Sequence, residues 1–166
     1  MFFGLFKKKS KPAISEQSYA VSGTNIHYKP NLISNLEDDH VSLLNLYGNI
    51  KAASESGNYK KTAEFLSIFR DELEDHLLKE NINLYIYLTH QLKGDALNTG
   101  LISKFRKEMN GIATLTLRFL EKYESIDSNI DLQKEFAEEF AFIGNALGKR
   151  IKREESMLYT LYAPPY

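Results

Sequence analysis

Cysteine is absent from this sequence of 166 residues. Disulfide bonds, zinc sites built on thiolates and catalysis by a thiol group are therefore excluded. Long apolar runs are absent too, because none approaches the ~20 residues that a membrane-spanning helix needs. The lack of cysteine is compatible with a reducing compartment, and we expect a cytoplasmic protein.

An excess of one charge sign is also missing. The chain has 21 Lys and Arg residues against 22 Asp and Glu residues, which gives a formal net charge of −1. This balance gives no reason to expect nucleic acid as a partner. The sequence contains neither a glycine-rich phosphate loop nor a nucleophile elbow, so no substrate or reaction is indicated and we do not expect an enzyme.

Residues 1–29 sustain no hydrophobic period and are rich in Ser, Gly and Pro, which predicts a disordered or extended tail or linker. The tail starts with the apolar residues 1–6, and lysines follow at 7–9. A secretory signal has the opposite order and a longer apolar stretch. Two interpretations stay open: a plain tail, or a weak membrane-surface contact through residues 1–11, with Phe side chains in the lipid interface and lysines on anionic head groups.

Four helical patterns follow the tail, each with apolar residues at spacings of three and four. We expect the helices to cover approximately residues 31–56, 59–92, 98–123 and 128–161. Ser56 and Gly57 end the first helix, Asn58 is a good cap for the second, and Gly94 closes it. Four amphipathic helices with short connections predict an all-α, up-and-down antiparallel four-helix bundle over residues 30–163.

Every one of the four apolar faces carries an ionisable residue. These residues are His40 on the first helix, His76 and Glu80 on the second, Glu108 on the third and Glu154 on the fourth. Burying such groups without partners costs several kcal/mol, so something inside the bundle has to satisfy them. Neighbouring helices run in opposite directions, which predicts that the five side chains converge toward one end of the bundle.

Two kinds of partner would satisfy this cluster. Nitrogen and oxygen ligands without thiolates suit non-haem iron, manganese or zinc. The alternative is a buried network of ion pairs, in which Arg150 contacts Glu80, Glu108 or Glu154. His40 fits a hydrogen-bonded core histidine as well as a ligand, and Glu108 fits an ion pair with an arginine.

Tyrosine is abundant near the ends of the second and fourth helices. Tyr85, Tyr87, Tyr159 and Tyr162 are more than a small bundle needs. They either pack inside the bundle or form a surface for a protein partner, since tyrosine is favoured at interfaces.

Three segments carry a family resemblance: Asp38-Asp39-His40, Asp75-His76-Leu77-Leu78-Lys79-Glu80, and the run from Arg150 to Tyr159. They resemble the hemerythrin-like domains, also called HHE cation-binding domains, and the likeness covers about residues 30–162. It implies a four-helix bundle that holds a non-haem di-iron centre. By this resemblance His40 and His76 are iron ligands, and Glu80 is the carboxylate that bridges the two irons. Family members bind or sense oxygen, handle iron, or act as regulators.

The chain departs from the family pattern on the third and fourth helices. Glu108 and Ile112 stand where the third helix of the family has histidine ligands, and Arg150 stands where the fourth-helix motif begins with histidine. Glu154 or Glu155 then supplies the late carboxylate. We therefore keep two hypotheses: an iron-binding protein for oxygen or small-ligand sensing or for iron handling, and a metal-free regulatory interaction module in which Arg150 ion pairs replace the metal.

Overall fold

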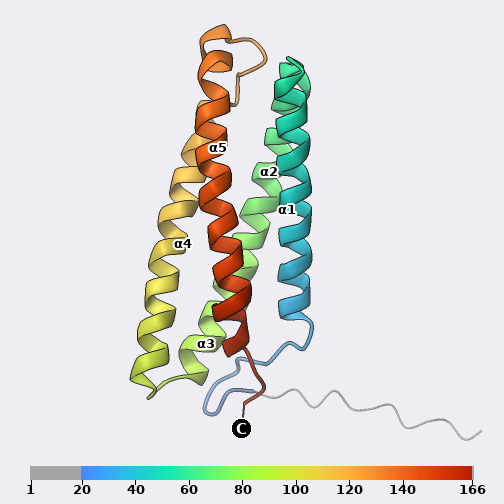
Figure 1. Cartoon of the computed structure of the whole chain (residues 1–166). Coiled ribbons are helices and arrows are strands. Elements are labelled where there is room, and N and C mark those ends of the chain that lie inside the picture. The colour runs from blue at the N-terminus through green and yellow to red at the C-terminus, as the bar shows by residue number, and fades with distance from the viewer. Residues whose placement is uncertain (1–19, 166) are drawn as a thin grey trace, which may run out of the picture.

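Four long helices run alternately up and down in the computed structural model, which describes residues 20–165 (Figure 1). α1 (Leu32–Glu55) runs up, α2 (Tyr59–Lys79) down, α4 (Ala96–Lys122) up and α5 (Ile130–Arg153) down. The π-helical segment η1 (Glu80–Tyr85) and α3 (Ile86–Gln91) continue α2 downward, while η2 (Glu154–Leu158, π-helical) and η3 (Tyr159–Leu161) continue α5. The predicted all-α, up-and-down four-helix bundle is confirmed.

Side-chain caps fix where three of the helices begin. Asn58 accepts a hydrogen bond from the backbone N–H of Lys61 at 3.1 Å, as its position in the sequence predicts. Asp95 does the same for Asn98 at 3.0 Å, so α4 begins two residues earlier than the sequence analysis placed it. Asn129 caps α5. These caps satisfy N–H groups that have no partner within the helix.

Both helices that run down change from α- to π-helix at a buried glutamate. η1 begins at Glu80 and η2 begins at Glu154. A π-turn widens the helix by one residue and is frequently found at functional sites. Continuous helices were expected here from the sequence. The spacing of the apolar residues did not reveal the two widened turns.

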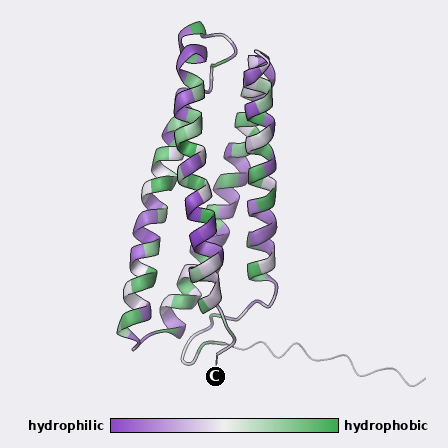
Figure 2. Ribbon diagram, viewed as in Figure 1, coloured by the Kyte–Doolittle hydropathy of each residue, from purple (hydrophilic) through white to green (hydrophobic). Residues whose placement is uncertain are grey.

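The hydrophobic core consists of two clusters with a polar layer between them. Figure 2 shows hydrophobic and hydrophilic residues alternating along each helix, as expected for helices with one buried face. Leu36, Leu84 and Phe105 belong to the lower cluster, whereas Phe69 and Phe136 belong to the upper one. The lower cluster also contains Tyr85, Tyr87, Tyr159 and Tyr162, all of them buried. These four tyrosines therefore pack inside the bundle, and the alternative of a partner surface built from them is wrong.

Part of the segment predicted as a tail packs against the lower end of the bundle. Val21 is buried in the lower cluster, and the N–H of Lys29 donates to the hydroxyl of Tyr162 at 2.8 Å. The predicted membrane contact through residues 1–11 lies outside the described residues. Among the helices that are described, none combines the length and the apolar character needed to cross a bilayer.

Candidate metal centre

The layer between the two clusters contains buried polar side chains from α1, α2, α5 and the two π-helical segments. His40 comes from α1, His76 from α2, Glu80 from η1, Arg150 from α5 and Glu154 from η2, and none is more than 3% exposed. His40, His76 and Glu154 each place a potential ligand atom within 4.8 Å of the others. Glu80 joins them through a 4.0 Å contact with His76, so the structure brings together four of the five residues proposed from the sequence.

The two histidines present the same ring nitrogen to the pocket. Nε2 of His40 lies 3.3 Å from Oε2 of Glu154, and its Nδ1 lies 2.8 Å from Oε1 of Glu155. In His76, Nε2 faces Oε2 of Glu80 at 4.0 Å, and Nδ1 lies 3.5 Å from Oδ2 of Asp39. Metal-binding histidines commonly have this arrangement, with a carboxylate behind the ring that fixes its orientation and tautomer.

Burial and charge shift the pKa values of the two imidazoles in opposite directions. Burial lowers the pKa of His40, but hydrogen bonds to Glu154 and Glu155 outweigh it and raise the pKa above its ordinary value. The pKa of His76 is lowered, first by burial and then by the neighbouring His40. His76 is therefore the neutral imidazole of the pair, which is the form that binds a metal ion.

Glu80 has only half of its hydrogen-bonding capacity used among the described residues. Its Oε1 accepts a hydrogen bond from the hydroxyl of Tyr159 at 3.0 Å, while its Oε2 is buried without a partner. Nδ1 of His76 is also buried without a hydrogen bond. Burial, together with the charge of Glu154, raises the pKa of Glu80 to about 8. A carboxyl group in this position gains a partner only if another donor or a cation enters the pocket.

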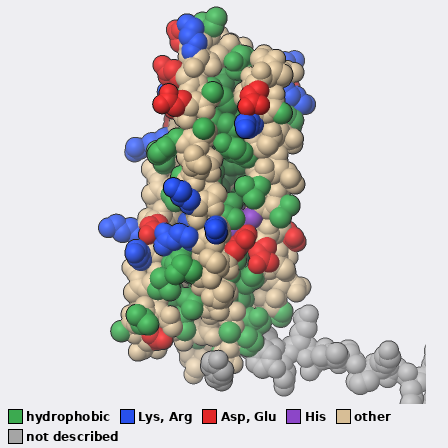
Figure 3. All heavy atoms as spheres, in the orientation of Figure 1, with side chains coloured by type: hydrophobic (Ala, Val, Ile, Leu, Met, Phe, Trp, Pro, Cys, Tyr) green, Lys and Arg blue, Asp and Glu red, His purple; other side chains and the backbone are tan. Residues whose placement is uncertain are grey.

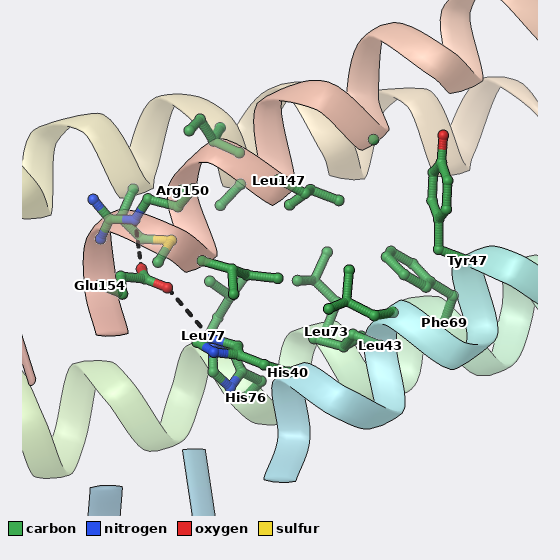
Figure 4. A pocket seen from close by; sticks show the side chains of 16 residues that line it. His40, Leu43, Tyr47, Phe69, Leu73, His76, Leu77, Leu147, Arg150 and Glu154 are labelled. Carbon is green, nitrogen blue, oxygen red and sulfur yellow. Dashed lines mark hydrogen bonds and ion pairs between the residues drawn. The ribbon is translucent and has the colours of Figure 1, made fainter. Parts of the chain in front are cut away.

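Arg150 binds one oxygen of Glu154 and leaves the other directed toward His40 (Figure 4). Its Nη1 donates to the carbonyl oxygen of Phe105 at 3.1 Å, and its Nη2 donates to the hydroxyl of Tyr85 at 2.6 Å. Of the three partners considered for Arg150 from the sequence, the structure selects Glu154.

Glu108, the remaining residue of the predicted set, lies outside this cluster. Its side chain is 31% exposed and forms a salt bridge with Arg153 at the edge of the bundle. From the sequence, Glu108 was expected on the apolar face of its helix, as a metal ligand or in an ion pair with an arginine such as Arg150. The correction follows from geometry, because α4 presents Met109 and Ile112 to the pocket instead.

Comparison with protein-family models gives one match, to the hemerythrin HHE cation binding domain, over residues 31–162. The chain belongs to the hemerythrin family. Comparisons with curated proteins and with solved structures found no match. The family match covers the whole bundle and confirms the resemblance seen in the sequence.

The pocket of this hemerythrin domain fits the cation that the family description names. Oε2 of Glu80 is buried without a hydrogen-bond partner and lies 4.0 Å from Nε2 of His76, while Nε2 of His40 lies 3.3 Å from Oε2 of Glu154. Two imidazoles and two carboxylates form a donor set of nitrogen and oxygen that suits a first-row transition metal.

Four residues around the hemerythrin pocket were not assigned these roles from the sequence. Glu155 hydrogen-bonds His40, and Asp39 lies 3.5 Å from Nδ1 of His76. Tyr85 accepts a hydrogen bond from Arg150, and Tyr159 donates one to Glu80. Asp39 and Glu155 each adjoin a ligand candidate in the chain, and that adjacency is the signal that was available. The tyrosines gave no separate signal, because tyrosines in a helical apolar stripe look like ordinary core residues.

An apolar cavity of about 120 Å³ extends from the polar cluster into the upper bundle. Leu43, Phe69, Leu73 and Leu147 line it, and the ring of Tyr47 lies across the end opposite the histidines (Figure 4). Hydrophobic side chains also follow the groove between α1 and α5 on the outside of the molecule (Figure 3). An apolar cavity of this size favours a small uncharged molecule over water.

Proposed function

We propose that this hemerythrin domain binds non-haem iron through His40, His76, Glu80 and Glu154. The observation that carries the proposal is the paired arrangement of the imidazoles, each with Nε2 toward buried carboxylates and Nδ1 toward an acid at the rim. Two histidines and a carboxylate are the typical ligands of ferrous iron with open coordination positions. The bound iron would supply those open positions for oxygen or a related small ligand.

The surrounding residues suit a binding protein that senses a small ligand or handles iron. Glu155 hydrogen-bonds the ring of His40, Asp39 lies 3.5 Å from the ring of His76, and the hydroxyl of Tyr159 donates to one oxygen of Glu80. The cavity of about 120 Å³ is far smaller than the ~300–1,000 Å³ typical of sites for larger organic ligands. We therefore also propose binding rather than catalysis.

Iron content after expression in iron-supplemented medium tests this proposal. We expect iron in the purified wild-type protein and its loss in the double variant His76→Ala, Glu80→Ala. A matched control is His90→Ala, Glu74→Ala, which removes an exposed histidine and an exposed glutamate from the same helical arm. Elemental analysis that finds far less than one iron per wild-type chain contradicts the proposal, as does equal loss in both double variants.

The second candidate is the metal-free regulatory module, and one observation favours it. Both oxygens of Glu154 already have partners, namely Nε of Arg150 and Nε2 of His40, so this carboxylate is satisfied without a metal ion. This candidate requires that chelators leave thermal stability unchanged and that Arg150→Ala strongly destabilises the fold. Melting that depends on a chelator rules it out.

A further inference from the structure

Arg150 lines the pocket on the side of α4, where its guanidinium contacts the backbone of Phe105. We propose that its guanidinium serves as a built-in cation and limits this hemerythrin domain to one metal ion per chain. The inference rests on the proposed metal binding and adds the number of ions that the pocket accepts.

The guanidinium is held in place from three directions. Nε donates to Glu154, Nη1 to the carbonyl oxygen of Phe105 at 3.1 Å, and Nη2 to the hydroxyl of Tyr85 at 2.6 Å. The ring of Phe105 also lies 5.0 Å from Cζ, within the range of a cation–π contact. Only 3% of the surface of Arg150 is exposed. If the side chain turned out into water, its buried hydrogen-bond partners would be left unpaired, which is costly. The positive charge is permanent, because arginine is not deprotonated in proteins.

The supply of ligands is sufficient for one ion and insufficient for two. His40, His76 and Glu154 place ligand atoms within 4.8 Å of one another, and Oε2 of Glu80 lies 4.0 Å from Nε2 of His76. A second ion would need the other oxygen of Glu154, which Arg150 already binds. The helix that faces this place, α4, offers the side chains of Met109 and Ile112 to the pocket, while its carboxylate Glu108 pairs with Arg153 outside.

The formal charges of the buried groups also favour one divalent ion over two. Glu80 and Glu154 carry two negative charges when both are ionised, and Arg150 carries one positive charge. One divalent ion brings the buried groups to a net charge of +1, whereas a second would bring them to +3. Asp39 and Glu155, the acids at the rim, face the Nδ1 atoms of the histidines and are 25% and 41% exposed. Because water screens exposed charges, these two carboxylates offset little of the positive charge inside the pocket.

Metal stoichiometry measures this directly. The full chain is freed of metal, titrated anaerobically with ferrous iron beyond saturation and desalted, and bound iron is determined by elemental analysis. We expect one iron per chain. Two irons per chain overturn the inference and leave the proposed function intact, whereas no bound iron overturns the proposed function and this inference with it.

Two variants of one residue test whether the guanidinium sets the limit. Arg150→His replaces the cation by a neutral ligand, and we expect bound iron to rise from one to two per chain. Arg150→Lys keeps a positive charge, and we expect it to stay at one. Circular dichroism is used to find conditions in which both variants keep the helical content of the wild type, and iron is titrated under those conditions. A folded Arg150→His protein that still binds one iron, or an Arg150→Lys protein that binds two, overturns the inference.

Discussion

The carboxyl group of Glu80 makes the stability of the metal-free protein depend on pH. Its pKa is raised to about 8, first by burial and then by Glu154, while the hydroxyl of Tyr159 and the charges of Arg150 and His40 act in the opposite direction. In the metal-free protein the folded state therefore keeps a proton that the unfolded chain releases near its ordinary pKa of 4.5. Stability gained from this proton is present at low pH and is lost as the pH rises toward 8.

Glu80→Gln should remove this dependence, because the amide keeps the shape of the side chain and does not titrate. We expect the free energy of unfolding of the metal-free wild type, relative to Glu80→Gln, to fall by up to about 1.4 kcal/mol per pH unit between pH 5 and about 8. Urea titrations at several pH values in the presence of a chelator measure this difference. If the free energies of unfolding of the wild type and Glu80→Gln differ by the same amount at every pH in that range, the pKa of Glu80 is not raised.

Tyr159 holds the single hydrogen bond that Glu80 receives among the described residues. Tyr159→Phe leaves both oxygens of Glu80 buried without a partner, so we expect a loss of about 1–3 kcal/mol in the free energy of unfolding. Tyr123→Phe is a matched control, because the hydroxyl of Tyr123 is buried without a hydrogen-bond partner. We expect it to keep or gain stability, and urea unfolding of both variants checks the contrast.

At the scale of the elements, Tyr47 of α1 lies directly over Gly144 of α5. A Cβ atom built on Gly144 would lie 2.2 Å from the hydroxyl oxygen of Tyr47, so this position requires glycine for space. The same tyrosine donates a hydrogen bond to the carbonyl oxygen of Phe140 at 3.2 Å and stacks on its ring at 4.2 Å. Glycine on α5 thus allows Tyr47 to lie across the end of the apolar cavity.

Gly144→Ala should therefore displace Tyr47 and lower the free energy of unfolding by about 1–3 kcal/mol. Gly148→Ala, one turn further along α5, is the matched control, because no atom beyond the neighbouring backbone of its own helix lies within 4 Å of the added Cβ. Alanine is the better helix former, and we expect this control to gain about 0.5–1 kcal/mol. Thermal or urea unfolding that ranks the two variants equally contradicts the close contact.

Helix existence and part of the site could be predicted from the sequence for definite reasons. Apolar spacing revealed the four helices, and Asn58 marked one start because its side chain acts locally. His40, His76, Glu80 and Glu154 stood out as ionisable groups on apolar stripes. Residues whose role depends on a neighbour from another helix, such as the salt bridge of Glu108 to Arg153, could not be predicted, since helix rotation is not visible in one sequence.

Considered as a whole, the molecule has two apolar clusters joined by a layer whose polar groups are incompletely satisfied. A ligand that binds the folded state alone stabilises it, by about 2.7 kcal/mol at a free concentration one hundred times its dissociation constant. The metal-free bundle should therefore be measurably less stable than the metal-bound bundle.

We expect saturating ferrous iron to raise the melting temperature of the chelator-treated protein by roughly 5 to 10 °C. The double variant His76→Ala, Glu80→Ala should show no such increase, because the ligands are gone. Anaerobic calorimetry with and without iron measures the shift. An increase of equal size in the double variant shows that iron acts elsewhere on the chain.

The paired π-turns have a consequence for how the two ends of the molecule fit together. Each widened turn adds one residue, and one residue in a helix corresponds to a rotation of about 100°. The residues that follow Glu80 and Glu154 are therefore rotated about the helix axis relative to the residues before them. This rotation begins in the polar layer in both arms. Removing one residue from a single arm would turn Leu84 or Leu158 away from its partners and leave the other arm where it was. The packing of the lower apolar cluster therefore depends on both widened turns, because each one sets the rotation of its own arm.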